Sequence, residues 1–338
     1  QATTRGWYWL ALLFQLLSLL AKASAVSLPF VLLILDVFPL RRLESLPWKK
    51  RMVALLWDKA PFFVLAAAAG ARAWVAQVEA GAMYPLIEYD ALSRAAQALY
   101  GMSFYAWKTL LPLDLGPLYQ IPHREILMGA LLWKGLLGSA ILLALALASR
   151  KHWPAVTAAI AAYIVMIVPV SGIFQSGPQL VADRYSYLSC LGFAVLPAAG
   201  LIWLAHSHVW RMRNAASVIV LACAVGLTTL FGATTEQAKK WSTALDLWKQ
   251  AVKVSPDSSI AHTNLADAFM SLPNPRIAAD HYRRALQLNP RDAIAAHNFG
   301  DALSSMGRHW EAEALYLHSL RLDSSRPRVF ISLAQLWI

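Results

Sequence analysis

Four cations stand beside or between long apolar runs of this sequence, where a positive charge can bind an anion. Lys22 separates two apolar segments, and Arg184 follows another in Asp183-Arg184-Tyr185. An ionisable residue inside a membrane is costly and is a functional candidate by default, although a lysine can also reach the interface. The planar fork of Arg184 suits a phosphate or an anionic headgroup, with an interfacial ion pair to Asp183 beside Tyr185 as the alternative.

Arg94 and Lys108 are similar candidates, and on one continuous helix they fall near one face. The alternative for each of the two residues is a surface charge that is solvated by water. No Gly-rich phosphate loop, nucleophile elbow, paired carboxylates or metal-ligand spacing accompanies them. No catalytic residue and no metal site are therefore predicted. Five histidines are expected on the surface of the C-terminal region: His262, His281, His297, His309 and His318.

The composition indicates an integral membrane protein. The chain is 58% hydrophobic and 14% charged, whereas soluble chains carry about 25% charged residues. Residues 154–182 and 185–205 contain no Asp, Glu, Lys or Arg, and runs of about 20 such residues can cross a bilayer. Seven membrane segments are predicted, at 7–20, 25–40, 53–71, 126–149, 154–172, 187–205 and 214–233.

Basic residues cluster after the second, fourth and sixth segments. The clusters are Arg41, Arg42, Lys49, Lys50 and Arg51; Arg150, Lys151 and His152; and His206, His208, Arg211 and Arg213. The positive-inside rule places them in the cytoplasm, which explains the net charge of +11 without nucleic acid. The long loop at 72–125 then faces outward, and the seventh segment delivers the C-terminal region to the outside, meaning the periplasm in a bacterium.

A period of 34 residues runs through the C-terminal region. It pairs Pro256 with Pro290, Asn264 with Asn298, Ala266 with Gly300, Asp267 with Asp301, Ala278 with Ala312 and Tyr282 with Tyr316. Small residues at helix crossings and a closing proline at this period are typical of tetratricopeptide repeats (TPR). Partial repeats are predicted on both sides, around Trp248 and around Phe330.

Polar residues recur on the first helix of each predicted repeat. Asn264 and Asp267 share a face, and Asn298 and Asp301 repeat the pair one period later. Buried packing does not require these polar residues, because other residues form the apolar stripe of each helix. A row of amides and carboxylates suits an extended peptide, and a solvated helix face is the alternative.

Several motifs in order resemble a known family. They are residues 19–30 (LLAKASAVSLPF), 33–42 (LILDVFPLRR), 59–63 (KAPFF) and 76–77 (AQ), then Arg94, Tyr105 and Lys108, then 111–119 (LPLDLGPLY), 181–188 (VADRYSYL) and the repeats. This order resembles the transmembrane and tetratricopeptide-repeat O-mannosyltransferases, especially their bacterial relatives. One departure is Ala23, where family members often have an acidic residue after the lysine.

The resemblance implies a GT-C-type glycosyltransferase that moves a sugar, with mannose as one candidate, from a polyprenyl-phosphate carrier to a protein hydroxyl on the non-cytoplasmic side. Lys22, Arg94, Lys108 and Arg184 are then expected to bind the carrier phosphate, supported by Asp183 and Tyr185. The family's acidic catalytic residue lies near the N-terminus of its members. Because Gln1 is not a start methionine, we expect this chain to be a C-terminal fragment that begins after that residue.

The sequence therefore predicts an all-α protein with a multi-pass membrane region at 1–235 and a TPR solenoid at 236–338. The predicted partners are membrane lipid, the lipid-linked sugar and a protein or peptide acceptor, but no nucleic acid. No cofactor is predicted, although a divalent metal stays open. A non-catalytic, membrane-anchored TPR scaffold is the alternative function. A bacterial inner membrane, with the repeats in the periplasm, is the expected location.

Overall fold

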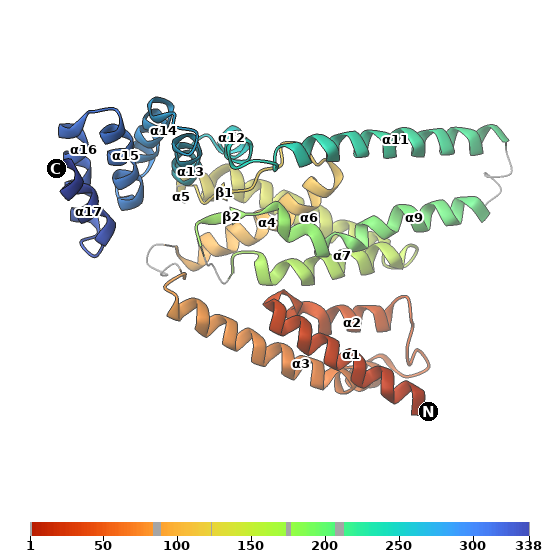
Figure 1. Cartoon of the computed structure of the whole chain (residues 1–338). Helices are drawn as coiled ribbons and strands as arrows, with labels where there is room; N and C mark the ends of the chain where they lie inside the picture. Colours follow the sequence, from red (N-terminus) through yellow and green to blue (C-terminus); the bar gives the residue numbers. More distant parts are fainter. Residues whose placement is uncertain (1, 84–88, 123, 174–176, 207–212, 338) are drawn as a thin grey trace. The chain divides into compact units, whose positions relative to one another are not determined.

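The computed structural model describes residues 2–83, 89–122, 124–173, 177–206 and 213–337 (Figure 1). It is almost entirely helical, which confirms the predicted all-α class. It divides into two compact units, a membrane unit of residues 1–113 and 121–218 and an array unit of residues 114–120 and 219–338. The division at 218/219 lies before the predicted boundary at 235/236. A short piece of the predicted outward loop, residues 114–120, belongs to the array unit.

The membrane unit consists of apolar helices and short irregular turns. Its elements are α1 (Ala2–Ala21), η1 (Ala23–Ser27), α2 (Leu28–Val37), α3 (Trp48–Glu79), α4 (Ala91–Leu110), α5 (Arg124–Ile126), η2 (Leu127–Leu131), α6 (Leu132–Ser149), α7 (Pro154–Ile167), η3 (Val168–Val170), β2 (Gln179–Val181), η4 (Asp183–Tyr185), α8 (Ser186–Ser189) and α9 (Leu191–His206). The strand β1 (Tyr119–Gln120) belongs to the array unit, and α11 (Arg213–Lys239) runs across the division.

Among the residues that the structure describes, three helices have the length and apolar composition needed to cross a membrane, namely Trp48–Glu79, Arg124–Ser149 and Ser217–Lys239. A fourth candidate is the pair Asp183–Ser189 and Leu191–Leu204, which is bent by 50°. Three shorter apolar helices cover Gly6–Ala21, Ala25–Val37 and Pro154–Val170. The predicted apolar segments are thus helical where the structure describes them. Seven crossings stay a prediction.

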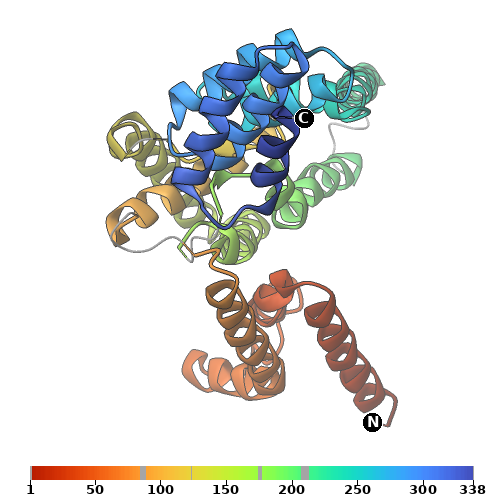
Figure 2. The same ribbon diagram turned by 60° about the vertical axis from the view of Figure 1, so that its left-hand side comes forward.

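The array unit contains stacked helical hairpins (Figure 2). Its helices after α11 are α12 (Ala244–Val254), α13 (Ser259–Met270), α14 (Pro275–Leu288), α15 (Ala293–Ser305), α16 (His309–Leu322) and α17 (Pro327–Leu336). The hairpins α13–α14 and α15–α16 are the two complete predicted repeats. The helices α12 and α17 are the predicted halves on either side. The period of 34 residues therefore gives a TPR array, as predicted.

Small residues at the helix crossings explain why the hairpins close. Ala266 of α13 and Ala278 of α14 are fully buried, and Tyr282 fills the space beside them. At Gly300, which takes the place of Ala266 in the next repeat, an added Cβ would lie 2.5 Å from the Tyr316 ring. Pro275 begins α14, where its missing N–H costs no hydrogen bond.

Candidate functional site

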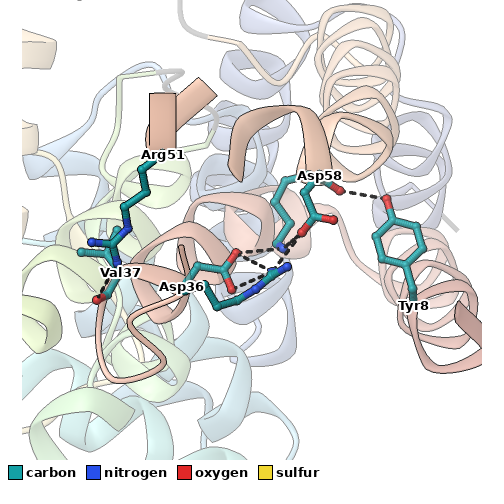
Figure 3. Close-up of polar contacts among 7 residues, drawn as sticks. Tyr8, Asp36, Val37, Arg51 and Asp58 are labelled. Carbon is teal, nitrogen blue, oxygen red and sulfur yellow. Dashed lines mark hydrogen bonds and ion pairs between the residues drawn. The ribbon is translucent and has the colours of Figure 1, made fainter. Parts of the chain in front are cut away.

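A network of four charges, of which Asp36 and Lys59 are buried, joins α2, the loop after it and α3 (Figure 3). Asp36, near the end of α2, is 3% exposed, and Nη1 of Arg42 lies 3.1 Å from each of its carboxylate oxygens. Nζ of Lys59, in α3, lies 2.9 Å from an oxygen of Asp36 and 2.5 Å from one of Asp58. Arg42 also lies 3.0 Å from Asp58, whose backbone carbonyl accepts a hydrogen bond of 2.9 Å from Tyr8 of α1.

Two sequence motifs that lie apart in the chain meet in this network. Residues 33–42 supply Asp36 and Arg42, and Lys59 opens the motif at 59–63. Two carboxylates balance two cations, so the network carries no net charge. Burying Asp36 and Lys59 is costly unless each one is paired, as both are here. The network therefore holds α1, α2 and the loop after α2 against α3.

A second set of contacts fastens β2 and the residues after it to α4. Nε2 of the buried Gln97 donates to the carbonyl of Leu180 at 2.8 Å and to that of Gln179 at 3.3 Å. Two turns later, the hydroxyl of Tyr105 accepts a hydrogen bond of 3.0 Å from the backbone N–H of Ala182. Burial raises the pKa of Tyr105, so its hydroxyl stays neutral. These contacts bring Asp183-Arg184-Tyr185 to α4.

The start of α4 is fixed by Asp90. Its carboxylate accepts a hydrogen bond of 2.8 Å from the N–H of Ser93, which caps the helix, and lies 2.9 Å from Arg124. The hydrogen bonds from Ser93, followed by the interaction with Arg124, lower the pKa of Asp90 to about 2. From this cap, α4 runs without interruption from Ala91 to Leu110. The predicted shared face of Arg94 and Lys108 requires such a continuous helix.

Two of the four predicted phosphate-binding cations lie on α4 and on the turn that Tyr105 holds against α4. Lys108 follows Tyr105 by one turn of α4, and its ammonium donates to the carbonyl of Leu113. Arg184 is exposed, and its Nη2 donates to Oε1 of Gln179 at 2.8 Å. Its guanidinium lies over the ring of Tyr185, 5.2 Å from the centroid. Arg184 therefore lies near Tyr105, whereas the Lys108 ammonium lies 5.6 Å from the ring centroid of Phe104, toward the end of α4.

The other two cations lie elsewhere in the membrane unit. Arg94 and Lys108 are 14 residues apart on α4, or about 21 Å at a rise of 1.5 Å per residue. Arg94 donates instead to the carbonyls of Tyr89 and Ile173. Lys22 is exposed and lies in an extended conformation between α1 and η1. A single phosphate cannot bridge Arg94 and Lys108 over that distance.

The predicted peptide-binding residues lie on the first helices of the hairpins and are half-buried. Nδ2 of Asn264 donates to the carbonyl of Ile260 within α13. Oδ1 of Asp267 accepts from the Tyr282 hydroxyl and, at 2.9 Å, from Nδ2 of Asn298 in the next hairpin.

The next repeat has the same arrangement, in which Oδ1 of Asp301 accepts from Tyr316 at 2.7 Å and from Ser332 at 3.2 Å. The two aspartates thus link consecutive repeats. The side chain of Asp301 nevertheless remains 42% exposed, so it can also contact a ligand.

The prediction that the repeat histidines lie on the surface is wrong for His262 and His297, which are buried. Nδ1 of His262 lies 3.1 Å from Nδ1 of His281, and its Nε2 lies 3.0 Å from the carbonyl of Pro256. Nε2 of His297 lies 3.0 Å from the hydroxyl of Ser332. The missed signal is that His262 lies one period of 34 residues before Ala296, a small residue at a buried helix position. Within the described residues, no group of three His, Cys, Asp or Glu side chains could hold a metal ion.

No family model matches the chain. No curated protein matches it either. Solved structures of TPR proteins match about a third of it.

MamA is 25% identical over 28% of this chain and 54% of its own length, with a TM-score of 0.27. The first TPR domain of human RPAP3 is 22% identical over 31% of this chain and 83% of its own length, with a TM-score of 0.28. PilF of Pseudomonas aeruginosa is 32% identical over 33% of this chain and 49% of its own length, with a TM-score of 0.26. The chain thus spans about half the length of MamA and of PilF. These similarities accompany the TPR fold that the hairpins themselves display.

Proposed function

We propose that the array binds a protein or peptide partner along the first helices of its hairpins. Asn264, Asp267, Asn298 and Asp301 present amides and carboxylates on that face, and these groups can hydrogen-bond to an extended backbone. The observation that carries this proposal is the recurrence of the same polar pair in consecutive hairpins, with the carboxylate of Asp301 still open to solvent.

The variant Asn264→Ala tests this binding with little disturbance of the array, because the Asn264 amide donates only within its own helix in the structure. Asn298→Ala is less clean, since Asn298 also links two hairpins through Asp267. We expect Asn264→Ala to weaken partner binding while the array unfolds at the same temperature. Unaltered partner affinity in this variant contradicts the proposed face.

We further propose that the membrane unit takes part in sugar transfer from a polyprenyl-phosphate carrier to a hydroxyl of that partner, on the non-cytoplasmic side of a bacterial inner membrane. The supporting observation is that Gln97 and Tyr105 hold residues 180–182, which directly precede Asp183 and Arg184, against α4, the helix that carries Lys108. A guanidinium and an ammonium there bind the carrier phosphate and stabilise the charge that develops on it as the sugar leaves. A carboxylate outside these residues deprotonates the acceptor hydroxyl.

The variant Arg184→Lys in the full-length protein tests this proposal, because lysine keeps the charge but loses the bidentate fork. We expect most of the transfer activity to be lost while membrane insertion and partner binding persist. Arg94→Lys is the matched control, since Arg94 lies about 21 Å from Lys108 along α4, and it should stay near wild type. Equal activity in both variants removes the role proposed for Arg184.

A non-catalytic scaffold is the second candidate, and the array favours it because peptide binding needs no chemistry in the membrane unit. The two functions differ in one measurement. If the full-length protein binds its partner but transfers no sugar from any polyprenyl-phosphate donor, the scaffold is the function. Sugar transfer that depends on Arg184 excludes it.

A further inference from the structure

Arg51, at the end of the first turn of α3, is buried without a carboxylate partner among the described residues. It is 8% exposed, although residues 41–50 before it are all exposed. Its Nη2 donates to the carbonyl of Val37 at 3.5 Å, which is longer than the usual range of about 2.7–3.2 Å. Its buried Nε has no hydrogen-bond partner in the described part of the chain. A guanidinium has five N–H donors, so these residues leave most of its binding capacity unused.

The charges around Arg51 do not compensate it. The neighbouring carboxylate of Asp36 is already paired with Arg42 and Lys59. Residues 36–59 contain six Lys or Arg and three Asp or Glu. Outside the network of Asp36, Arg42, Asp58 and Lys59, four cations therefore stand against Glu44 alone, namely Arg41, Lys49, Lys50 and Arg51. Because a buried charge is costly unless it is paired, this excess predicts an anion as its partner.

The start of α3 adds further positive charge at the same place. The helix begins at Trp48, with no acidic residue in its first turn and no side-chain cap from Pro47. The first N–H groups of a helix have no partner within it and carry a partial positive charge. Lysines are normally found at the other end of a helix, whereas Lys49 and Lys50 lie in this first turn. An anion bound here would balance the helix end and the three cations together.

The apolar residues around this site indicate a lipid. Leu43, Leu46 and Trp48 are exposed, and α3 is long and apolar enough to cross a membrane. The first turn of such a helix lies at the level of the headgroups, where tryptophan and basic residues are enriched. Figure 3 shows the Arg51 side chain reaching from α3 to Val37, where the loop after α2 begins. A phospholipid supplies both a phosphate for the cations and apolar chains for the leucines.

We propose that Arg51, Lys49, Lys50 and the first N–H groups of α3 bind the phosphate of an anionic phospholipid, in the leaflet that the loop after α2 faces. Nε and Nη2 form one edge of the guanidinium and bind two phosphate oxygens. The long contact with Val37 lets the side chain rotate to present that edge. The two lysines add attraction to the headgroup. All of these groups belong to the membrane unit, and the site does not depend on the proposed sugar transfer.

The first test measures how tightly the full chain in micelles binds phosphatidylglycerol, by native mass spectrometry, with phosphatidylcholine as the zwitterionic comparison. Arg51→Lys should bind phosphatidylglycerol about tenfold more weakly than the wild type, because lysine keeps the charge but loses the fork. Arg72→Lys is the matched control, since Arg72 is an exposed arginine of the same helix. It should match the wild type. Equal affinity in the two variants overturns the proposed site.

A second variant keeps the test valid if the buried Arg51 cannot be replaced without unfolding the protein. Lys50→Gln changes an exposed side chain of the first turn and should weaken phosphatidylglycerol binding about fivefold. Lys151→Gln removes the same charge from another exposed basic cluster of the membrane unit and should leave the affinity unchanged. An equal loss in both variants means diffuse attraction to the whole surface and overturns the proposal.

The place and the source of the phosphate are tested on the wild type itself. Phosphatidylglycerol with a photoreactive headgroup should label residues 38–51, as found by peptide mass spectrometry, and labelling confined to other residues overturns the site. Millimolar inorganic phosphate should not displace the lipid, because it lacks the chains that lie beside Leu43 and Trp48. Complete displacement by inorganic phosphate overturns the lipid as the ligand.

Discussion

Substitution of Asp36 by asparagine is the sharpest test of how the membrane unit is held together. Asp36 contributes one of two carboxylates to the buried network, and its side chain is 5% exposed. Asparagine keeps the shape but leaves Arg42 and the equally buried Lys59 with Asp58 as their remaining carboxylate in the network. Breaking a buried pair in this way costs about 3–5 kcal/mol, because a charge stays buried without compensation.

An exposed pair in the same unit provides the comparison. Arg72 and Glu79 lie 3.5 Å apart on α3, with side chains 71% and 66% exposed. Such pairs contribute about 0–1 kcal/mol, so Glu79→Gln should leave the stability almost unchanged. The assay is equilibrium unfolding of the purified protein in mixed micelles, with the free energy of unfolding as the measured quantity.

Removal of both partners gives a further check. The double variant Asp36→Leu with Lys59→Met replaces the pair by apolar side chains, and it should cost less than Asp36→Asn alone. A free-energy loss for Asp36→Asn no larger than that for Glu79→Gln refutes the reasoning. It also refutes the idea that this network holds the first three helices together.

Three other predictions concern the array and the topology. Gly300→Ala should lower the free energy of unfolding of the array by about 1–3 kcal/mol, because its Cβ meets the Tyr316 ring at 2.5 Å; Gly232→Ala, inside α11 with no atom within 4 Å of the added Cβ, should instead raise it by about 0.5–1 kcal/mol through the higher helix propensity of alanine. Burial lowers the pKa of His262 and of His281 below the ordinary value of 6.5, with Asp257 and Arg284 facing His262 and Asp280 facing His281. Stability of the array is then full above about pH 6.5 and is lost as the pH falls from there through the lowered pKa of the folded state, and the melting temperature measured against pH should decline less in His262→Gln. Cysteines at Arg41 and at the exposed Asp257 should label from opposite sides of the membrane in spheroplasts, whereas labelling from one side contradicts an odd number of crossings.

The array could be predicted from the sequence because its contacts are local and periodic. Ala266, Ala278 and Tyr282 recur at fixed spacing, and each packs against the neighbouring helix of its own hairpin. Helical periodicity therefore contains most of the information that fixes this fold. The polar pairs Asn264–Asp267 and Asn298–Asp301 were placed on the correct helices. Their links to Tyr282 and Tyr316 were not predicted, since nothing in the period reports the direction of a side chain.

The contacts of the membrane unit could not be predicted in the same way. The network of Asp36, Arg42, Asp58 and Lys59 joins residues from two helices and a loop, and a single sequence carries no signal for such a pairing. The hydrogen bond from Ala182 to Tyr105 spans 77 positions. The sequence indicated that Arg94, Lys108 and Arg184 were candidates, but only the fold shows that Gln97 and Tyr105 hold the residues before Arg184 against α4.

Residues 114–120, which belong to the array unit, explain a feature of the array that the repeats alone leave unexplained. The helix α12 is a half repeat, and its Gln250 is 6% exposed. A buried amide without a hydrogen-bond partner costs about 1–3 kcal/mol, so Gln250 would destabilise an array that lacked the carbonyl of Leu115. Repeat arrays also need their terminal repeats covered. The carbonyls of Leu115 and Leu118 and the side chain of Gln120 meet both needs at the start of the array. The first half repeat therefore depends for its stability on residues 114–120.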